Sequence, residues 1–134
     1  ASGAPAQEGY EQVDFETLLT QSDIISVHAP LNEHTEGLIN SKAFEKMKSS
    51  CIFLNLGRGP IVDEQALYNA LVRNQIAAAG LDVLCKEPMS ADNPLLKIKD
   101  SKRLLITPHI AWASVEARTH LMEIIHGQVK DFFA

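Results

Sequence analysis

Apolar residues in this chain gather in short continuous runs that alternate with stretches of helical periodicity. Continuous runs rich in branched aliphatic residues are typical of strands buried on both faces of a sheet. Four such runs predict strands: Ile24–His28, Cys51–Leu56, Ala77–Val83 and Leu104–Thr107. Apolar residues three or four positions apart predict helices. Helices are accordingly expected over Phe15–Thr20, Leu38–Met47, the residues after Asp63 and the long segment from Ser114 onward.

Polar residues near the predicted helices indicate where two of them begin. Ser41 is placed to cap the main part of the helix within Leu38–Met47, and Asp63 is placed to cap the next helix. Between the third and fourth strands, residues 86–100 are polar and contain proline, which predicts a loop with a short apolar pair at Leu95 and Leu96.

Strands that alternate with helices indicate βαβ units and a parallel sheet covered by helices on both faces. The sequence therefore predicts an α/β fold, a doubly wound, Rossmann-like parallel sheet with about four main strands and flanking helices. With 134 residues the chain has the length of one domain. Residues 1–12 are expected to form a flexible lead-in, and residues 13–134 to form the folded part.

Charge and composition exclude several classes of function. The formal net charge is −5, and lysine and arginine are scattered rather than clustered, so no nucleic-acid partner is expected. No uncharged apolar stretch reaches the roughly 18 residues of a membrane span, and the first residues do not resemble a secretory signal. The two cysteines, Cys51 and Cys85, do not form the framework of a secreted disulfide domain, which favours the cytoplasm.

Polar side chains stand where the predicted strands end. His28, Arg58, Asp82 and His109 each follow or close an apolar run, and Glu87 comes shortly after the third. Ligands of open parallel sheets bind beyond the carboxyl ends of the strands. The convergence of two imidazoles, a guanidinium and two carboxylates on one rim therefore predicts an active site.

His109 and Glu87 are the candidates for acid–base chemistry. His109 follows Pro108 and has apolar neighbours, and an imidazole titrates near working pH, so it can act as a general acid or base. A carboxylate such as Glu87 beside it would favour the imidazolium. The alternatives are a histidine that only satisfies a backbone carbonyl, and a solvated surface glutamate.

Arg58 and Asp82 are the candidates for ligand binding. Arg58 lies between two glycines, and its planar guanidinium suits a carboxylate; the alternative is an ion pair with a neighbour such as Asp63. Asp82 ends an apolar strand, where an unpaired carboxylate would be costly, so it must meet a helix N-terminus or a polar group of a ligand.

The other histidines, the cysteines and the glycine turn give weaker indications of function. His28 and His34 have no cysteine or acidic partner at metal-ligand spacing, so no metal site is predicted. Cys85 has apolar neighbours and is expected to be an inert thiol, and His120 and His126 are expected to face solvent. Gly57-Arg58-Gly59 begins a dinucleotide fingerprint, but Val62 occupies the third glycine position, so this turn is not expected to hold a pyrophosphate.

The chain resembles the D-isomer-specific 2-hydroxyacid dehydrogenases across nearly its whole length. Several separate motifs, in the family's order and spacing, make the match specific. They are Ser22–Leu31, Thr35–Asn40, Asn55–Leu67, Ala79–Val83, Glu87-Pro88 and Ile106–Trp112. Within the family, the segment Ile-Thr-Pro-His-Ile-Ala-Trp-Ala is most similar to the glycerate dehydrogenases, also called hydroxypyruvate reductases.

The resemblance implies a role for each candidate residue. Arg58 would bind the substrate carboxylate, His109 would protonate the C2 oxygen as hydride arrives, and Glu87 would orient His109; Trp112 would close the substrate pocket. NAD is the implied cofactor, with NADP not distinguished. The residues expected to contact it are Ala29, Pro30, Leu31, Thr35, Leu56, Gly57, Arg58, Asp82, His109 and Ala111.

The resemblance also implies what lies outside this chain. The family's glycine-rich loop, its ribose-binding acidic residue and its substrate domain have no counterpart here, so the chain is expected to be the C-terminal part of the NAD-binding domain. The intact parent, expected to be a homodimer, would reduce a small 2-oxoacid to the D-2-hydroxyacid, and this piece alone would be inactive. The alternatives are a non-catalytic NAD(H)-sensing scaffold of the corepressor type, or a piece that self-associates through its sheet edge or final helix.

Overall fold

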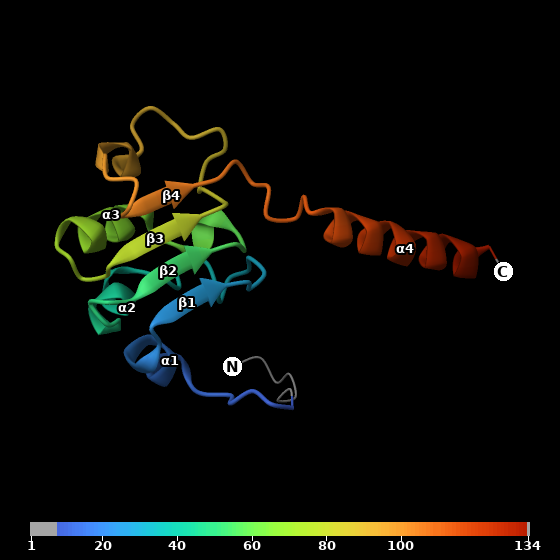
Figure 1. The fold of residues 1–134 in the computed structure, drawn as a ribbon, viewed down its shortest axis with the longest axis horizontal. Coiled ribbons are helices and arrows are strands. Elements are labelled where there is room, and N and C mark those ends of the chain that lie inside the picture. Colours follow the sequence, from blue (N-terminus) through green and yellow to red (C-terminus); the bar gives the residue numbers. More distant parts are fainter. Residues whose placement is uncertain (1–7, 134) are drawn as a thin grey trace.

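A parallel sheet forms the centre of the computed structural model, which describes residues 8–133. Four strands follow one another in the order β1-β2-β3-β4, every neighbouring pair parallel. Their bounds are β1 Ile24–Val27, β2 Ile52–Asn55, β3 Ala78–Leu81 and β4 Leu104–Ile106. All four arrows in Figure 1 point the same way, so their carboxyl ends share one rim of the sheet. The predicted Rossmann-like α/β sheet of about four parallel strands is confirmed.

Helices and short 3-10 turns connect the strands. The helices are α1 Phe15–Gln21, α2 Ser41–Lys46, α3 Glu64–Val72 and α4 Val115–Phe132, and the 3-10 turns are η1 Gly59–Ile61 and η2 Pro94–Lys97. Residues 8–14 contain no helix or strand, and the rest of the predicted lead-in, residues 1–7, lies outside the described part of the chain. Between residues 8 and 133 no helix combines the length and the apolar character needed to cross a membrane.

The hydrophobic core lies on one face of the sheet. Ile25, Val27 and Phe53 point into it and meet side chains from α1, α2, α3 and η2 in a single cluster. The alternate strand positions are bare: Ile24 is 61% exposed and Leu105 is 63% exposed. The expectation of helices on both faces is therefore wrong for the described residues.

The strand order explains why one face is bare. Each connection moves the chain to the next strand in the same direction, and βαβ crossovers are right-handed almost without exception. Right-handed crossovers that all step the same way place their helices on the same face. Covering the second face would require strands added beyond β1 by steps in the opposite direction.

Helix α2 begins differently from the expectation. Its N-cap is Asn40, not Ser41: the Asn40 side chain accepts hydrogen bonds from the amides of Lys42, at 3.0 Å, and Ala43, at 3.3 Å. Leu38 and Ile39 precede the helix, and Ile39 forms an isolated parallel bridge with Val62. Leu38 and Ile39 therefore pack against the core as part of the loop before α2, and the prediction that the helix begins at Leu38 is wrong.

The predicted cap at Asp63 is confirmed, because its side chain accepts from the amide of Ala66 at the start of α3. Helix α4 is capped by Ser114, whose side chain accepts from the amide of Ala117. Helix α4 projects away from the sheet and none of its residues is buried (Figure 1). His120 and His126 on this helix are exposed, as expected.

Candidate functional site

Asp82 stands directly after β3 and holds the loop that follows β4. Its Oδ1 accepts hydrogen bonds from the Thr107 hydroxyl, at 2.6 Å, and the Ile110 amide, at 2.9 Å, while Oδ2 accepts from the Ala111 amide at 2.8 Å. Although burial opposes ionisation, these hydrogen bonds lower the pKa of Asp82 below its ordinary value. The partner of this carboxylate is a backbone turn of the same chain, where the sequence had indicated a helix N-terminus or a ligand.

His109 occupies the middle of that turn in a conformation that is uncommon for residues other than glycine. Its φ is +56°, in the left-handed region. The turn is fixed on both sides, because Asp82 binds the next two amides and the Trp112 indole donates to the His109 carbonyl at 2.8 Å. Such strained residues cluster at functional sites, where the surroundings enforce them.

The His109 imidazole binds the Glu87 carboxylate. Nδ1 of His109 lies 2.9 Å from Oε2 of Glu87, and Oε1 of Glu87 accepts from the Leu84 amide, also at 2.9 Å. The Leu84 amide and the His109 contact lower the pKa of Glu87, so the carboxylate is ionised at neutral pH and Nδ1 carries the shared proton. The predicted pair is present, in place of a histidine bound to a carbonyl or a solvated glutamate.

This arrangement leaves the other imidazole nitrogen available. Within residues 8–133, Nε2 of His109 has no hydrogen-bond partner, and the side chains of His109 and Glu87 remain 41% and 39% exposed. A ring held through Nδ1 presents Nε2 outward in one orientation. The pair can therefore exchange a proton with a ligand on the rim.

Arg58 lies on the same rim, after β2. Its Nη1 donates to the Gly57 carbonyl at 2.9 Å, and no carboxylate in the described part of the chain lies within 4.0 Å of its guanidinium. Asp63, the expected alternative partner, caps α3 instead. The exposed guanidinium is thus free of internal ion pairs and can bind an anionic group.

Asn55 presents Arg58, a role that the sequence analysis missed. Its side chain accepts from the Gly57 amide at 3.1 Å and donates to the Arg58 carbonyl at 3.0 Å, and only 1% of the residue is exposed. The available signal was a polar residue at an inward-facing position of a buried strand. Thr107 and the Leu84 amide, which bind Asp82 and Glu87, were missed too because their contacts depend on loop geometry.

The loops after β1 and β2 form a shallow pocket beside Arg58. Its walls come from His28, Ala29, Pro30, Leu31, Leu56, Gly57 and Arg58. A Cβ at Gly57 would lie 3.0 Å from the Ala29 carbonyl oxygen, so this glycine lets the two loops meet. Thr35 folds the first loop by donating to the Pro30 carbonyl at 2.7 Å.

The pocket combines the apolar side chains of Ala29, Pro30, Leu31 and Leu56 with the polar groups of His28 and Arg58. In the Gly57-Arg58-Gly59 turn, a Cβ at Gly59 would overlap the Leu84–Cys85 peptide, and the chain continues directly into η1. The glycine is used there for close packing.

The remaining candidate groups form no second centre. Nε2 of His28 lies 2.8 Å from the Ser26 hydroxyl, and His34 is paired only with Glu33, at 3.5 Å. Burial and the Glu64 carboxylate raise the pKa of the Cys85 thiol to about 11, which makes it a poor nucleophile, as expected. Residues 8–133 contain no cluster of three potential metal ligands.

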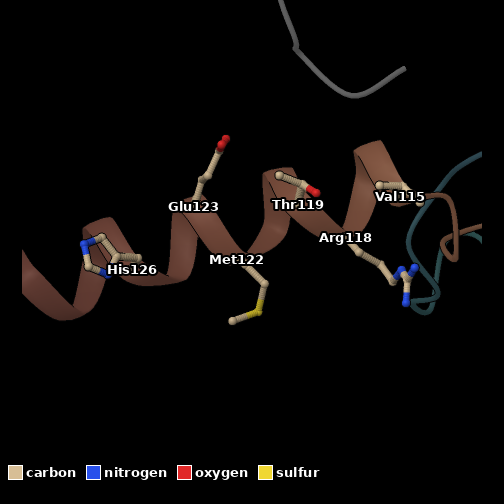
Figure 2. A pocket seen from close by; sticks show the side chains of 6 residues that line it. All are labelled: Val115, Arg118, Thr119, Met122, Glu123 and His126. Carbon is tan, nitrogen blue, oxygen red and sulfur yellow. The ribbon is translucent and has the colours of Figure 1, made fainter.

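A hollow on α4 lies outside the rim. Figure 2 shows that its lining side chains, among them Arg118, Met122, Glu123 and His126, all rise from this one helix. Glu123 and Met122 leave the helix on opposite sides. Because these groups do not converge on a point, the hollow is not a candidate for chemistry.

Known proteins resemble this chain in sequence over most of its length. It is 46% identical over 125 residues to a hydroxypyruvate reductase of Blautia hydrogenotrophica, covering 93% of this chain and 38% of that relative. It is 50% identical over 119 residues to a D-3-phosphoglycerate dehydrogenase of Archaeoglobus fulgidus, covering 89% of this chain and 22% of the relative. The chain thus spans less than half of the length of these relatives.

Solved structures resemble it in fold. An acyclic imino acid reductase in complex with NADPH and D-Arg superposes with a TM-score of 0.85 at 36% identity, over 96% of this chain and 40% of that one. A D-lactate dehydrogenase with NAD+ from Lactobacillus jensenii gives a TM-score of 0.71 at 36% identity, over 84% of this chain and 37% of that one. The model of the D-isomer specific 2-hydroxyacid dehydrogenase NAD-binding domain matches residues 2–111. The chain therefore belongs to the D-isomer specific 2-hydroxyacid dehydrogenase family, as part of its NAD-binding domain.

Proposed function

We propose that the polypeptide containing this chain reduces a small 2-oxoacid of the hydroxypyruvate or glyoxylate type to the D-2-hydroxyacid. The observation that carries the proposal is the His109–Glu87 contact of 2.9 Å, which fixes an imidazole on the rim with its second nitrogen available. NAD(H), when bound, supplies the hydride in this chemistry. The names of relatives, which include hydroxypyruvate reductase, glycerate dehydrogenase and glyoxylate reductase, support this substrate class.

Each rim residue has a task in the proposed reaction. Arg58 binds the substrate carboxylate and polarises the C2 carbonyl, and His109 donates its Nε2 proton to the C2 oxygen. Glu87 holds the imidazole in orientation and stabilises its charge. Trp112, whose indole is fixed on the His109 carbonyl, closes the substrate pocket.

The cofactor contacts in the proposal lie around Arg58 and His109. Asp82, which shapes the turn carrying His109 and Ala111, lies at the nicotinamide end. The loop from Ala29 to Thr35 (which includes Pro30 and Leu31), together with Leu56 and Gly57, lines the other side of the cofactor. NAD and NADP are both compatible with these residues.

The chain's relation to the whole protein is also part of the proposal. We infer that residues 13–134 form the C-terminal part of the NAD-binding domain, and that this part alone does not turn over because substrate specificity and pyrophosphate binding reside elsewhere. The parent acts as a homodimer. The free cysteines Cys51 and Cys85 support a cytoplasmic setting.

Initial rates separate this function from the non-catalytic alternative. The intact polypeptide is assayed with NADH and with NADPH against hydroxypyruvate, glyoxylate and pyruvate, and this chain alone is assayed beside it. Turnover of hydroxypyruvate or glyoxylate by the intact protein only is the expected result. A protein that binds NADH yet is silent with every 2-oxoacid would instead act as a cofactor-sensing scaffold.

A further inference from the structure

The first residue of α3, Glu64, reaches across to the loop that carries Glu87. Its Oε1 accepts from the Cys85 amide at 2.8 Å, and its Oε2 accepts from the Asn93 side-chain amide, also at 2.8 Å. These bonds span 21 and 29 residues of sequence, so they are tertiary contacts. The two oxygens of one carboxylate thus hold both ends of the segment from Cys85 to Asn93.

The same segment is packed tightly at its start. Gly59 lies against the Leu84–Cys85 peptide, and the Cys85 thiol donates to the Val62 carbonyl at 3.5 Å. At the far end, Asn93 is 6% exposed and its Oδ1 accepts from the Leu95 amide at 2.9 Å. The buried Asn93 amide and the packed peptide leave the Glu64 carboxylate in one position.

Glu87 lies between these two anchors. Its Oε1 accepts from the Leu84 amide, one residue before the amide that Glu64 binds, and its Oε2 meets Nδ1 of His109. Glu64 and Glu87 therefore bind consecutive backbone amides, those of Cys85 and Leu84. A shift of this peptide would move the carboxylate that orients the imidazole.

We propose that Glu64 is a positioning residue for the reaction: it fixes the Leu84–Asn93 loop so that Glu87 meets His109. This inference rests on the proposed function, in which His109 protonates the substrate. Glu64 touches neither His109 nor Glu87, so its effect on catalysis passes through the loop. Loss of Glu64 should lower kcat and leave the cofactor KM unchanged, because the pocket near Ala29 and Leu56 is formed by other loops.

Exchange of the two partners tests the contact in the full-length enzyme. E64Q keeps an acceptor for the Cys85 amide but turns an amide donor toward the Asn93 amide, and N93D sets two carboxylates against each other. The double variant E64Q/N93D restores a carboxylate–amide hydrogen bond with the roles reversed and with unchanged net charge. We expect each single variant to lose about tenfold in kcat and the double variant to regain most of it. The exposed neighbour variant Q65A is the control and should match wild type.

A cycle with Glu87 separates positioning from general stability. E87Q is expected to lower kcat by about 100-fold, and adding E64Q to it should lower kcat little further, since the group that Glu64 positions is already lost.

The inference is overturned if E64Q leaves kcat unchanged, or if E64Q lowers kcat by the same factor in wild type and in E87Q. Should E64Q fail to fold, N93S, which can still cap the Leu95 amide, takes its place in the cycle. If wild type reduces no 2-oxoacid, the proposed function itself fails, whereas a normal E87Q loss without an E64Q loss refutes only this inference.

Discussion

Asp82 is a carboxylate that is only 3% exposed, and its stability depends on complete hydrogen bonding. An ionised group in such a place is costly unless donors replace its hydration. Thr107 and the amides of Ile110 and Ala111 supply these donors. Because the amides belong to the residues that follow His109, the same bonds set the direction in which the imidazole leaves the backbone.

Replacement of Asp82 by asparagine tests this hydrogen bonding. In D82N a side-chain amide faces the amide of Ala111 or Ile110, so one donor loses its partner, and we expect a loss of about 1–3 kcal/mol in the free energy of unfolding at pH 7. The folded-state pKa of Asp82 lies below its ordinary value, so its stabilisation is complete above an ordinary aspartate pKa of about 3.9 and is lost as pH falls through the folded-state value.

The measurement is urea unfolding of both proteins between pH 7 and pH 3. The difference between wild type and D82N should be constant at neutral pH and shrink as the solution becomes strongly acidic. The exposed variant E45Q serves as the control and should follow wild type throughout. A difference that is absent at pH 7, or that grows towards acid pH, would contradict the role given to Asp82.

At the scale of single residues, the sequence indicates which polar side chains gather on the rim more reliably than it indicates what they bind. His109, Glu87 and Arg58 could be selected because they follow apolar strands. Asp82 was identifiable for the same reason, but its partners come from a turn 28 and 29 residues further on, and no local pattern encodes that contact. Glu64 carried no signal, since an acidic residue in a first helical turn is common.

At the scale of elements, Asn40 caps helix α2 because its side chain accepts hydrogen bonds from two backbone amides. Ser41, the predicted cap, follows it directly as the first residue of the helix. An N-cap residue needs an extended backbone, and Asn40 has φ −108° and ψ −173°. Ile39, immediately before it, is drawn into the core by its bridge to Val62. The apolar residue before the cap, Ile39, therefore belongs to the bridged loop, whereas Ala43 and Phe44 after the cap are the buried residues of the helix.

The cap can be tested with two neighbouring alanine substitutions. N40A removes the acceptor for the amides of Lys42 and Ala43 and should destabilise the domain by about 1 kcal/mol. S41A should change the free energy of unfolding by a few tenths of a kcal/mol at most, because Ser41 is already inside the helix. Denaturant unfolding of both variants gives the comparison. A larger loss for S41A than for N40A would restore the serine as the cap.

Two glycines should respond to alanine in opposite directions. G59A would place a Cβ on the Leu84–Cys85 peptide, and we expect a loss of about 1–3 kcal/mol. G127A adds a Cβ in the interior of α4 with nothing within 4 Å, which should stabilise that helix by up to about 1 kcal/mol. Thermal unfolding followed by circular dichroism measures both. Equal effects of the two variants would show that Gly59 is not a packing contact.

The sequence predicts the helices and strands, but it does not predict that one face of the sheet is uncovered. Hydrophobic runs predict four strands because a sheet interior excludes polar residues, and helical periodicity predicts α1, α3 and α4 because apolar residues three or four positions apart share one face of a helix. The bare face was missed because Ile24, Ile52 and Leu105 are as apolar as the residues on the covered face. Only the strand order and the handedness of the connections reveal which side the helices take.

At the scale of the whole molecule, the bare sheet face and α4 both expose apolar side chains. Ile24, Ile52 and Leu105 lie on the first. The second carries exposed apolar residues along the whole helix: Val115, Leu121, Met122, Ile124, Ile125, Val129 and Phe132. Contiguous exposed apolar surface of this kind favours association.

The chain on its own is therefore expected to self-associate. Light scattering coupled to size exclusion should give a mass above that of one chain, and replacing Ile24 and Leu105 by serine together with Leu121 and Ile125 by glutamine should shift the mass towards a monomer. Glutamine at Glu45 is the control for a change of surface residue without a change of apolar area. A folded wild-type chain that stays monomeric at all concentrations would contradict this expectation.

The proposed reaction depends on the His109–Glu87 pair at the rim of the sheet. The rate of NADH oxidation with hydroxypyruvate is measured for the full-length protein and for H109Q, with NADH binding followed by fluorescence in both. We predict that wild type turns over and that H109Q still binds NADH but loses at least about 100-fold in kcat, because glutamine cannot supply the proton that Nε2 of His109 is proposed to donate. An H109Q protein that retains the wild-type kcat would contradict the assignment of His109 as the proton donor.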